Sequence, residues 1–363
     1  MKKNLLILAA MLLALANGYS QEVTFNTGAF EVYVGTYGKI RLYGTDGTKH
    51  LHRATILVGT SSTAVFDHEN DAEVVEPTVA VAAPLSSDYE IYGAYDNSYS
   101  NDPPKVLVKL YVYGWNNAAY TIAKYVVRND EATAINASMG LEVFPSLNDE
   151  YGFDTVTYNA AEGVIRHHRA AQPNMGIKLL SASMSSLYSF EWYDGYQVDS
   201  DFWTWMNYGS LQPQYVSNVE GPVTITSQSP VSIAPGETFT VFYALSLGAD
   251  EQAMLANLAT AKQKYELLIT SLKENQLAGS ELKNYPNPVK SATTFSYQLP
   301  GNGMVTLKVY DALGNEKAVL VNEKQTAGAH TVNFDAKDLA SGVYSCKLIF
   351  DDQVITSKMM VVK

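Results

Sequence analysis

The region with the most side chains suited to ligand binding runs from Phe190 to Tyr208. It holds three of the four tryptophans of the chain, with tyrosines, acids and amides between them. A flat aromatic ring can stack on the C–H face of a sugar while neighbouring polar side chains reach its hydroxyl groups. The pattern therefore predicts a glycan-binding surface, with the candidate residues Trp192, Tyr196, Trp203, Trp205 and Tyr208. The alternative is a long loop whose aromatic rings only cover one end of the fold.

No local motif of a catalytic site accompanies these rings. The chain has no Gly-x-Ser-x-Gly motif and lacks the Asp, His and Ser signatures of subtilisin-like proteases. Acid pairs such as Glu69 with Asp71, or Asp149 with Glu150, can in principle supply the carboxylates of a glycosidase. Adjacent acids in polar loops are more often solvated. We therefore favour a non-enzymatic binding or adhesion module, with a carbohydrate-active hydrolase as the alternative.

Several histidines have spacings that a metal site can use. His50 and His52 would project from the same face of a strand, and imidazole nitrogen is a common zinc ligand. Further ligands could come from His167-His168 and Asp67-His68, but adjacent histidines point to opposite sides of a strand. Nothing in the sequence brings these segments together. We interpret them as solvated polar residues near turns and predict no metal site.

Two groups of oxygen-bearing side chains are the candidate calcium ligands. Ca²⁺ prefers carboxylate and carbonyl oxygens. Neither group has the Asp-x-Asp-x-Asp-Gly spacing of a dedicated calcium loop. We predict no cofactor, with Ca²⁺ kept as the alternative. The two groups are Asp194, Asp199 and Asp201, and Asp96, Asn97 and Asp102.

The elements that must position these side chains are mostly strands. Between residues 22 and 247 apolar and polar residues alternate in many short runs, of which Lys105–Tyr113 is the clearest. Turn residues at regular spacing between the runs predict one large antiparallel β-sandwich. From Asp250 to Glu274 the apolar residues recur every three or four positions, which predicts an amphipathic helix with Asp250 as its N-cap. Residues 275–283 lack periodicity, so we expect a linker there.

Composition and the N-terminus set the cellular context. With 47% hydrophobic and 17% charged residues the chain is that of a folded protein, and its net charge of −12 argues against a nucleic-acid partner. Lys2 and Lys3 precede an apolar stretch over residues 5–16, and small residues flank a cleavage point before Gln21. Residues 1–20 are therefore predicted to be a secretory signal peptide. We expect the large sandwich domain to span residues 21–274.

The last part of the chain, residues 284–363, again alternates and predicts a small antiparallel β-sandwich of about seven strands. The single cysteine, Cys346, lies in one of these runs and is interpreted as a small core residue. Four pieces occur in order: Tyr285-Pro-Asn-Pro288, Val309-Tyr-Asp-x-x-Gly314, Ala340-Ser-Gly-Val-Tyr344 and a lysine-rich end. On these pieces the segment resembles the C-terminal sorting domain of the type IX (Por) secretion system. The residues that carry the resemblance are Pro286, Asn287, Pro288, Gly314, Gly342, Tyr344 and Lys358.

The resemblance implies an export route. It implies an Ig-like fold for residues 284–363, recognition by the type IX translocon, and removal of the domain by a sortase. The cut is expected in the linker, at the residues Ala278, Gly279 and Ser280. The body would then be attached to surface lipopolysaccharide at the outer membrane or released as a secreted protein. Bacteria with this system O-glycosylate a motif that Asp154-Thr155-Val156 matches, so Thr155 is a candidate site.

A second resemblance covers residues 105–265. A Gly221-Pro222 strand, a turn built on Ala234-Pro-Gly-Glu237, and a helix with Ala261 and Tyr265 near its end follow one another. This order is similar to β-sandwich units that often precede type IX sorting domains. It implies no catalytic role. The ligand of the body, if it has one, is expected to be a glycan.

Overall fold

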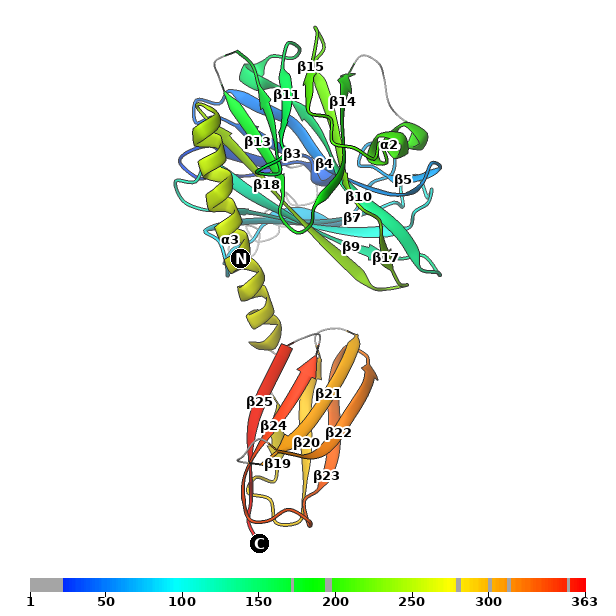
Figure 1. Ribbon diagram of the computed structural model, residues 1–363, viewed down its shortest axis with the longest axis vertical. Coiled ribbons are helices and arrows are strands. Elements are labelled where there is room, and N and C mark those ends of the chain that lie inside the picture. Colours follow the sequence, from blue (N-terminus) through cyan, green and yellow to red (C-terminus); the bar gives the residue numbers. More distant parts are fainter. Residues whose placement is uncertain are drawn as a thin grey trace, which may run out of the picture. The chain divides into compact units, whose positions relative to one another are not determined.

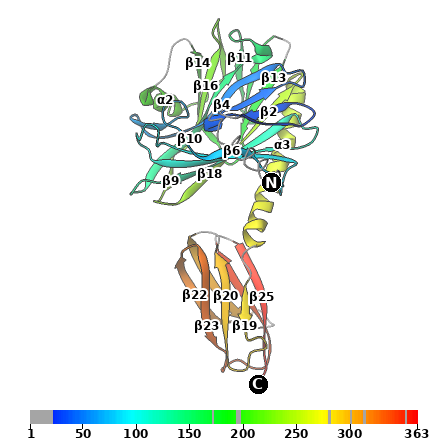
Figure 2. The ribbon, with the colours of Figure 1, turned by 180° about the vertical axis from the view of Figure 1, so that it is seen from behind.

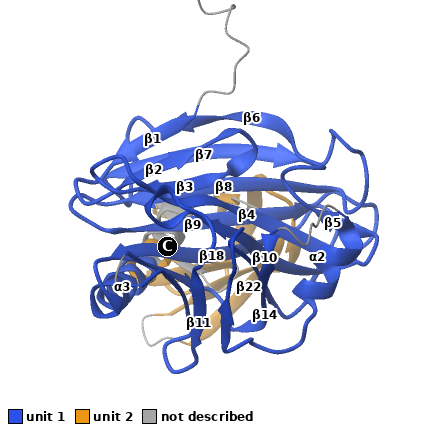
Figure 3. Cartoon of the chain, turned by 90° about the horizontal axis from the view of Figure 1, so that it is seen from above, with its two compact units in different colours: residues 1–265 blue, residues 266–363 orange. Residues whose placement is uncertain are grey.

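The computed structural model describes residues 22–170, 173–192, 198–278, 282–299, 302–311, 315–350 and 353–363. The chain divides into two compact units, Met1–Tyr265 and Glu266–Lys363 (Figure 3). The predicted signal peptide lies outside the described residues, as do Tyr196, Asp194, Gly279, Ser280 and Gly314.

Two antiparallel sheets form the first unit. The first has nine strands among the described residues, in the order β1-β2-β3-β4-β10-β16-β14, with β5 paired to β4 and β17 to β10 (Figure 1). Its strands are β1 (Val23–Asn26), β2 (Glu31–Val34), β3 (Ile40–Tyr43), β4 (Lys49–Ser61), β5 (Ala64–Phe66), β10 (Ile135–Pro145), β14 (Met184–Glu191), β16 (Pro222–Gln228) and β17 (Val231–Ile233).

The second sheet also has nine strands in the described part of the chain, in the order β15-β11-β12-β13-β18-β9-β8-β7-β6. They are β6 (Glu73–Ala80), β7 (Tyr89–Asp96), β8 (Val106–Gly114), β9 (Tyr120–Asn129), β11 (Thr155–Asn159), β12 (Val164–His168), β13 (Asn174–Leu179), β15 (Gln214–Val216) and β18 (Thr238–Gly248).

One apolar core is built from strands of both sheets. Along β8, Val106, Val108, Leu110 and Val112 are buried in this core, because every second side chain of a strand points to the same face. Burying each such side chain contributes about 1.5–3 kcal/mol to folding. The predicted all-β, antiparallel architecture is confirmed.

The long helix α3 (Glu251–Ala278) follows β18. As predicted, Asp250 caps it, since its Oδ1 accepts a hydrogen bond of 2.7 Å from the backbone N–H of Ala253. Met254 and Leu258 lie over Gly176 of β13, where any larger side chain would collide with them. The helix reaches Ala278, so residues 275–278 of the expected linker are helical. Glu, Gln, Leu and Ala at its end are good helix formers, and Gly279 is the first helix-breaking residue.

The described residues contain one α-helix that the sequence analysis did not predict. A second helix, α2 (Asp199–Met206), occupies the region expected to be a loop, and two 3₁₀ turns are η1 (Thr36–Gly38) and η2 (Leu147–Asp149). The residues of α2 have low intrinsic helix propensity, so packing against the sheet has to stabilise this helix. None of the helices that the structure describes is long and apolar enough to cross a membrane.

The second unit is a sandwich of a three-stranded and a four-stranded sheet in its described residues (Figure 2). The strands are β19 (Lys283–Tyr285), β20 (Ala292–Leu299), β21 (Gly303–Tyr310), β22 (Glu316–Gln325), β23 (Gly328–Asp335), β24 (Gly342–Phe350) and β25 (Gln353–Val361). Cys346 is fully buried in the core of this unit, and burial raises the pKa of its thiol to about 12. A protonated, buried thiol is the structural residue that the sequence predicted.

Candidate ligand-binding surface

Helix α2 covers part of the outer face of the first sheet, the face turned away from the main core. Phe202 and Met206 of the helix are buried in a separate apolar cluster that includes Leu57 of β4 and Ile225 of β16. Gly59 allows this close approach, because a Cβ at that position would lie 3.2 Å from both the Met206 sulfur and the Trp203 ring. The helix thereby holds Trp203 and Trp205 against the sheet.

The rings of β14 and α2 form a stack on this face. The Trp205 ring lies on Phe190 with centroids 4.0 Å apart and an interplanar angle of 22°. Tyr188 stacks on Trp205 at 6.3 Å and contacts Tyr208 at 4.7 Å. Tyr208 is 46% exposed, whereas Trp203 and Trp205 are half-buried. Of these predicted binding residues, Tyr208 presents the most surface to a ligand.

A second group of rings surrounds Trp192, which directly follows β14. Trp192 is 42% exposed and stacks on Phe144 of β10, with centroids 5.8 Å apart and 14° between planes. Tyr151 packs on Phe144 at 5.3 Å, and its hydroxyl lies 3.0 Å from Nδ1 of His52. Because Phe144 and Phe190 belong to one apolar cluster, the two groups of rings form one surface. We call it the aromatic surface: Tyr151, Phe144, Trp192, Phe190, Trp205, Tyr188 and Tyr208.

Sequence reasoning missed three of the side chains around Trp192. Phe144, Tyr151 and His52 come from segments distant in the chain, and no local pattern links them to Trp192. The alternation of β10 predicts only that Phe144 lies on a strand face. Their meeting depends on the pairing of β4, β10, β16 and β14.

A buried ion pair lies beside Phe144 on the same face of the first sheet. Arg53 binds the Glu142 carboxylate through two hydrogen bonds, from Nε to Oε2 at 3.0 Å and from Nη2 to Oε1 at 2.7 Å. Thr55 donates a third hydrogen bond, of 2.9 Å, to the same carboxylate. The Arg53 guanidinium lies 5.4 Å from the centre of the Phe144 ring. Glu142 is 2% exposed. The guanidinium thus packs against the Phe144 ring, and the Glu142 carboxylate is held by three donors rather than presented to solvent.

The histidines of this region are neutral near pH 7. Burial lowers the pKa of His68 to about 3, and its Nδ1 lies 3.9 Å from Oε2 of Glu142, beyond hydrogen-bonding distance. Burial and the neighbouring Arg53 lower the pKa of His52 to about 4. His50 and His167 are also buried, so the expectation of solvated histidines near turns was wrong for three of them, His50, His68 and His167. His50 of β4 and His167 of β12 lie on strands, where alternation turns their side chains into the protein, whereas His68 is buried in the turn after β5.

No group of three or more His, Cys, Asp or Glu side chains within the described residues can hold a metal ion. Of the predicted calcium ligands, Asp199 accepts the N–H of Val65 at 3.2 Å, and Asp96 accepts that of Ser98 at 3.0 Å. Asn97 donates to the carbonyl of Asp102 at 2.6 Å. These side chains fasten turns and strand ends, and Ca²⁺ stays the alternative to the prediction of no cofactor.

The acids of the predicted glycosidase pairs differ in burial and in bonding. Glu69 is exposed, whereas Asp71 is buried and accepts hydrogen bonds from the N–H of Asp67 and the hydroxyl of Ser100 at 2.9 and 2.6 Å. Burial raises the pKa of Asp71. Glu150 forms an ion pair with Arg169. One carboxylate of each pair is therefore already engaged within the fold.

Thr155 lies in the interior of the second sheet. It is half-buried in β11, between Val216 of β15 and His168 of β12. Asp154 before it is buried and binds Nε of Arg169 at 2.8 Å; burial raises the pKa of this carboxyl to about 6 although Arg169 favours its ionised form. O-glycosylation of Thr155 stays a prediction.

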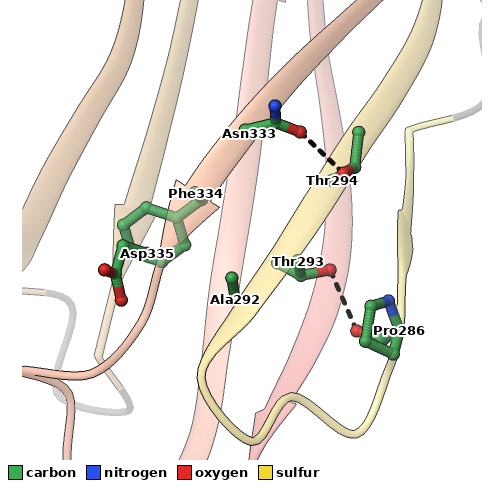
Figure 4. A pocket seen from close by; sticks show the side chains of 7 residues that line it. All are labelled: Pro286, Ala292, Thr293, Thr294, Asn333, Phe334 and Asp335. Atoms are coloured by element: carbon green, nitrogen blue, oxygen red, sulfur yellow. Dashed lines mark hydrogen bonds between the residues drawn. The ribbon is translucent and has the colours of Figure 1, made fainter.

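In the second unit the structure joins the two ends of the sorting motif. The Asn287 side chain donates to the carbonyl of Lys358 at 2.9 Å and accepts the N–H of Met360 at 2.9 Å, across 71 positions of sequence. Gly342 begins β24, and the hydroxyl of Tyr344 donates to the carbonyl of Ala340 at 2.9 Å. Beside this loop lies a cavity of about 330 Å³ (Figure 4), lined by Pro286, Ala292, Thr293, Thr294, Asn333, Phe334 and Asp335.

Comparison with protein families agrees with this geometry. Residues 283–363 match the family described as the secretion system C-terminal sorting domain. The predicted resemblance to the type IX sorting domain is confirmed, and the domain indicates export of the protein to the cell surface or medium. No curated protein matches the chain.

Three solved structures illustrate what the fold is similar to. A bacterial glucoamylase complexed with acarbose has 11% identity and a TM-score of 0.49; 68% of this chain and 36% of that chain are covered. A protein from Escherichia coli K12 described as a putative aldose 1-epimerase has 12% identity and a TM-score of 0.38. The match covers 63% of this chain and 99% of that chain. A heparan sulfate lyase from Pedobacter heparinus has 9% identity and a TM-score of 0.37. The match covers 95% of this chain and 43% of that chain. The chain thus spans about a third of the glucoamylase, and TM-scores below 0.5 assign no function to it.

Proposed function

We propose that this protein, which carries a type IX sorting domain at residues 283–363, is a secreted or surface-attached binding module for glycans. In this proposal a signal peptide takes the chain across the inner membrane. The translocon recognises the sorting domain, and a sortase removes it near Ala278. The body is then attached to lipopolysaccharide or released, and it binds glycans through the aromatic surface.

The observation that carries the proposal is the fixed position of Trp192. Its ring lies flat on Phe144, and the Arg53 guanidinium packs against the Phe144 ring. A ring fixed in this way loses little conformational entropy when a ligand binds, which favours affinity. Tyr151 and Tyr208 add exposed rings with hydroxyl groups on either side, at 40% and 46% exposure. Such amphipathic rings suit the alternating C–H and hydroxyl surfaces of sugars.

Binding is favoured over hydrolysis by the state of the acids. A glycosidase needs two carboxyl groups about 5–10 Å apart and open to the substrate. Glu142, the carboxylate two residues before Phe144 on the same face of β10, is held by Arg53 and Thr55. The hydrolase alternative would require acids of other segments to reach the same surface.

A glycan array probed with the mature chain tests the proposal. We expect binding to a defined glycan class, and Trp192→Ala should weaken it by about tenfold or more, or about 1.4 kcal/mol. Tyr208→Ala should weaken it less, because one ring of several is lost. The matched control is Tyr111→Ala, a half-buried tyrosine on β8 of the second sheet, which should leave affinity unchanged.

Two outcomes would count against the proposal. One is the absence of binding to any glycan on an array that a known lectin reads correctly. The other is equal loss of affinity in Trp192→Ala and Tyr111→Ala, which would indicate general destabilisation. Release of reducing sugar from the bound glycan would favour the hydrolase.

A further inference from the structure

Three exposed apolar side chains gather where β11 and β15 meet the loops before and after them. Phe153 is 65% exposed, Val219 65% and Val216 60%. Val216 pairs with Thr155 in the sheet, and the N–H of Phe153 donates to the carbonyl of Asn218. We call these three residues the apolar ridge. Figure 1 shows β11, β14 and β15 together at this end of the unit.

The loop that carries Phe153 is held in an unusual conformation. Phe153 has φ of 56°, a left-handed backbone that bulky L-residues rarely adopt. Arg169 fastens the loop, because its guanidinium donates to the Gly152 carbonyl, to Glu150 and to Asp154. A side chain at Gly152 would collide with the carbonyl of Val219, so the two loops lie backbone to backbone. The fold therefore keeps a phenylalanine ring in solvent at a conformational cost.

The neighbouring loop is fixed just as firmly. The Glu191 carboxylate accepts the N–H groups of Asn218, Glu220 and Gly221 at 2.9, 2.8 and 3.1 Å. Val219 stands in the middle of this arrangement. A rigid apolar ridge needs little ordering when a partner binds, and that is the usual property of an interaction hot spot.

The charges beside the ridge are mostly acidic. The segments 146–154 and 216–221 contain four acids, Asp149, Glu150, Asp154 and Glu220, and no Lys or Arg. Glu191 adds a fifth acid, and Arg169 supplies the base that pairs with two of them. A second copy of the chain would bring acids against acids, and an anionic lipid surface would be repelled in the same way. The Arg169 guanidinium and the N–H groups bound by Glu191 are engaged within the fold, which leaves few donors for sugar hydroxyls.

We propose that the apolar ridge docks a partner protein that presents apolar side chains flanked by lysine or arginine. This surface adjoins the aromatic surface, with Gly221 between Gly152 and Phe144, but it shares no residue with it and takes a ligand of different chemistry. Apolar contact at Phe153 and Val219 would supply affinity, and the acids would select basic partners and exclude acidic ones.

Immobilised peptides of 15 residues test the inference with the mature chain in solution. Three sets share the same apolar residues and differ in the others: Lys and Arg, Asp and Glu, or Ser and Asn. We expect measurable binding to the basic set, weaker at high salt and reduced about tenfold or more by Phe153→Ser or Val219→Ser. The matched control is Val75→Ser, an exposed valine of β6 at 46% exposure, which should bind as wild type does.

Other outcomes overturn the inference. These are no binding to any set, equal binding to the acidic set, or binding that Phe153→Ser and Val219→Ser leave unchanged while both variants unfold at the wild-type temperature. Sedimentation showing a dimer that Phe153→Ser dissociates would assign the ridge to self-association. If the wild-type chain binds phosphatidylcholine vesicles and Phe153→Ser does not, the ridge would be assigned to lipid. Phe153→Ser should keep full glycan binding and Trp192→Ala full peptide binding, so failure of this inference is distinguishable from failure of the glycan proposal.

Discussion

At the scale of single residues, Arg53 and Glu142 show how a charged pair can serve a binding surface without touching the ligand. Both side chains are nearly inaccessible, at 9% and 3% exposure, and each needs the other to offset the loss of hydration. Arg53 packs against Phe144, so a change in the pair is transmitted to the ring on which Trp192 stacks.

Arg53→Met should therefore destabilise the protein strongly, because it leaves the Glu142 carboxylate buried without its cation. We expect a loss of about 3–5 kcal/mol in the free energy of unfolding measured with urea. The double variant Arg53→Met with Glu142→Leu should recover most of that loss, because no buried charge then remains. If the single and double variants were equally unstable, packing rather than charge would explain the effect.

At the scale of elements, the strands could be predicted and α2 could not. Runs such as Lys105–Tyr113 alternate because one face must meet the core, and the structure has β8 there. The apolar residues that recur every three or four positions predicted α3 equally clearly. Helix α2, by contrast, depends on a sheet face assembled from β4, β10, β14 and β16, which no window of sequence contains. The aromatic surface was predicted only where its rings are close in sequence, so Phe144 and Tyr151 were missed.

Phe202 tests how far α2 supports the aromatic surface. It is 4% exposed and anchors the helix, yet it lies in the apolar cluster under the rings. Phe202→Ala should cost about 3–5 kcal/mol of unfolding free energy and weaken glycan binding, because Trp205 and Tyr208 lose their support. Phe202→Leu, which keeps most of the volume, should restore much of both in thermal unfolding and binding assays. Unchanged near-ultraviolet circular dichroism of the tryptophans in Phe202→Ala would contradict the role given to α2.

At the scale of the whole molecule, the two units have separate cores and separate tasks. The second unit holds its own apolar core, and Asn287 joins its first loop to its last strand. These features were predictable as a sandwich because the motif occupies one continuous stretch. The task of the first unit was less predictable, because its surface is assembled from distant segments.

Removal of the second unit provides the last prediction. In the native bacterium, a chain ending at Ala278 should be expressed and folded but retained in the periplasm, since the domain that the translocon recognises is gone. Fusion of residues 283–363 to a fluorescent reporter with the same signal peptide should send the reporter to the surface or medium. Intact-mass analysis of the full-length chain recovered from culture should show a C-terminus near Ala278. Secretion of the truncated chain at the wild-type level, or mature protein that keeps residues 284–363 in the periplasm, would show that this unit does not direct export.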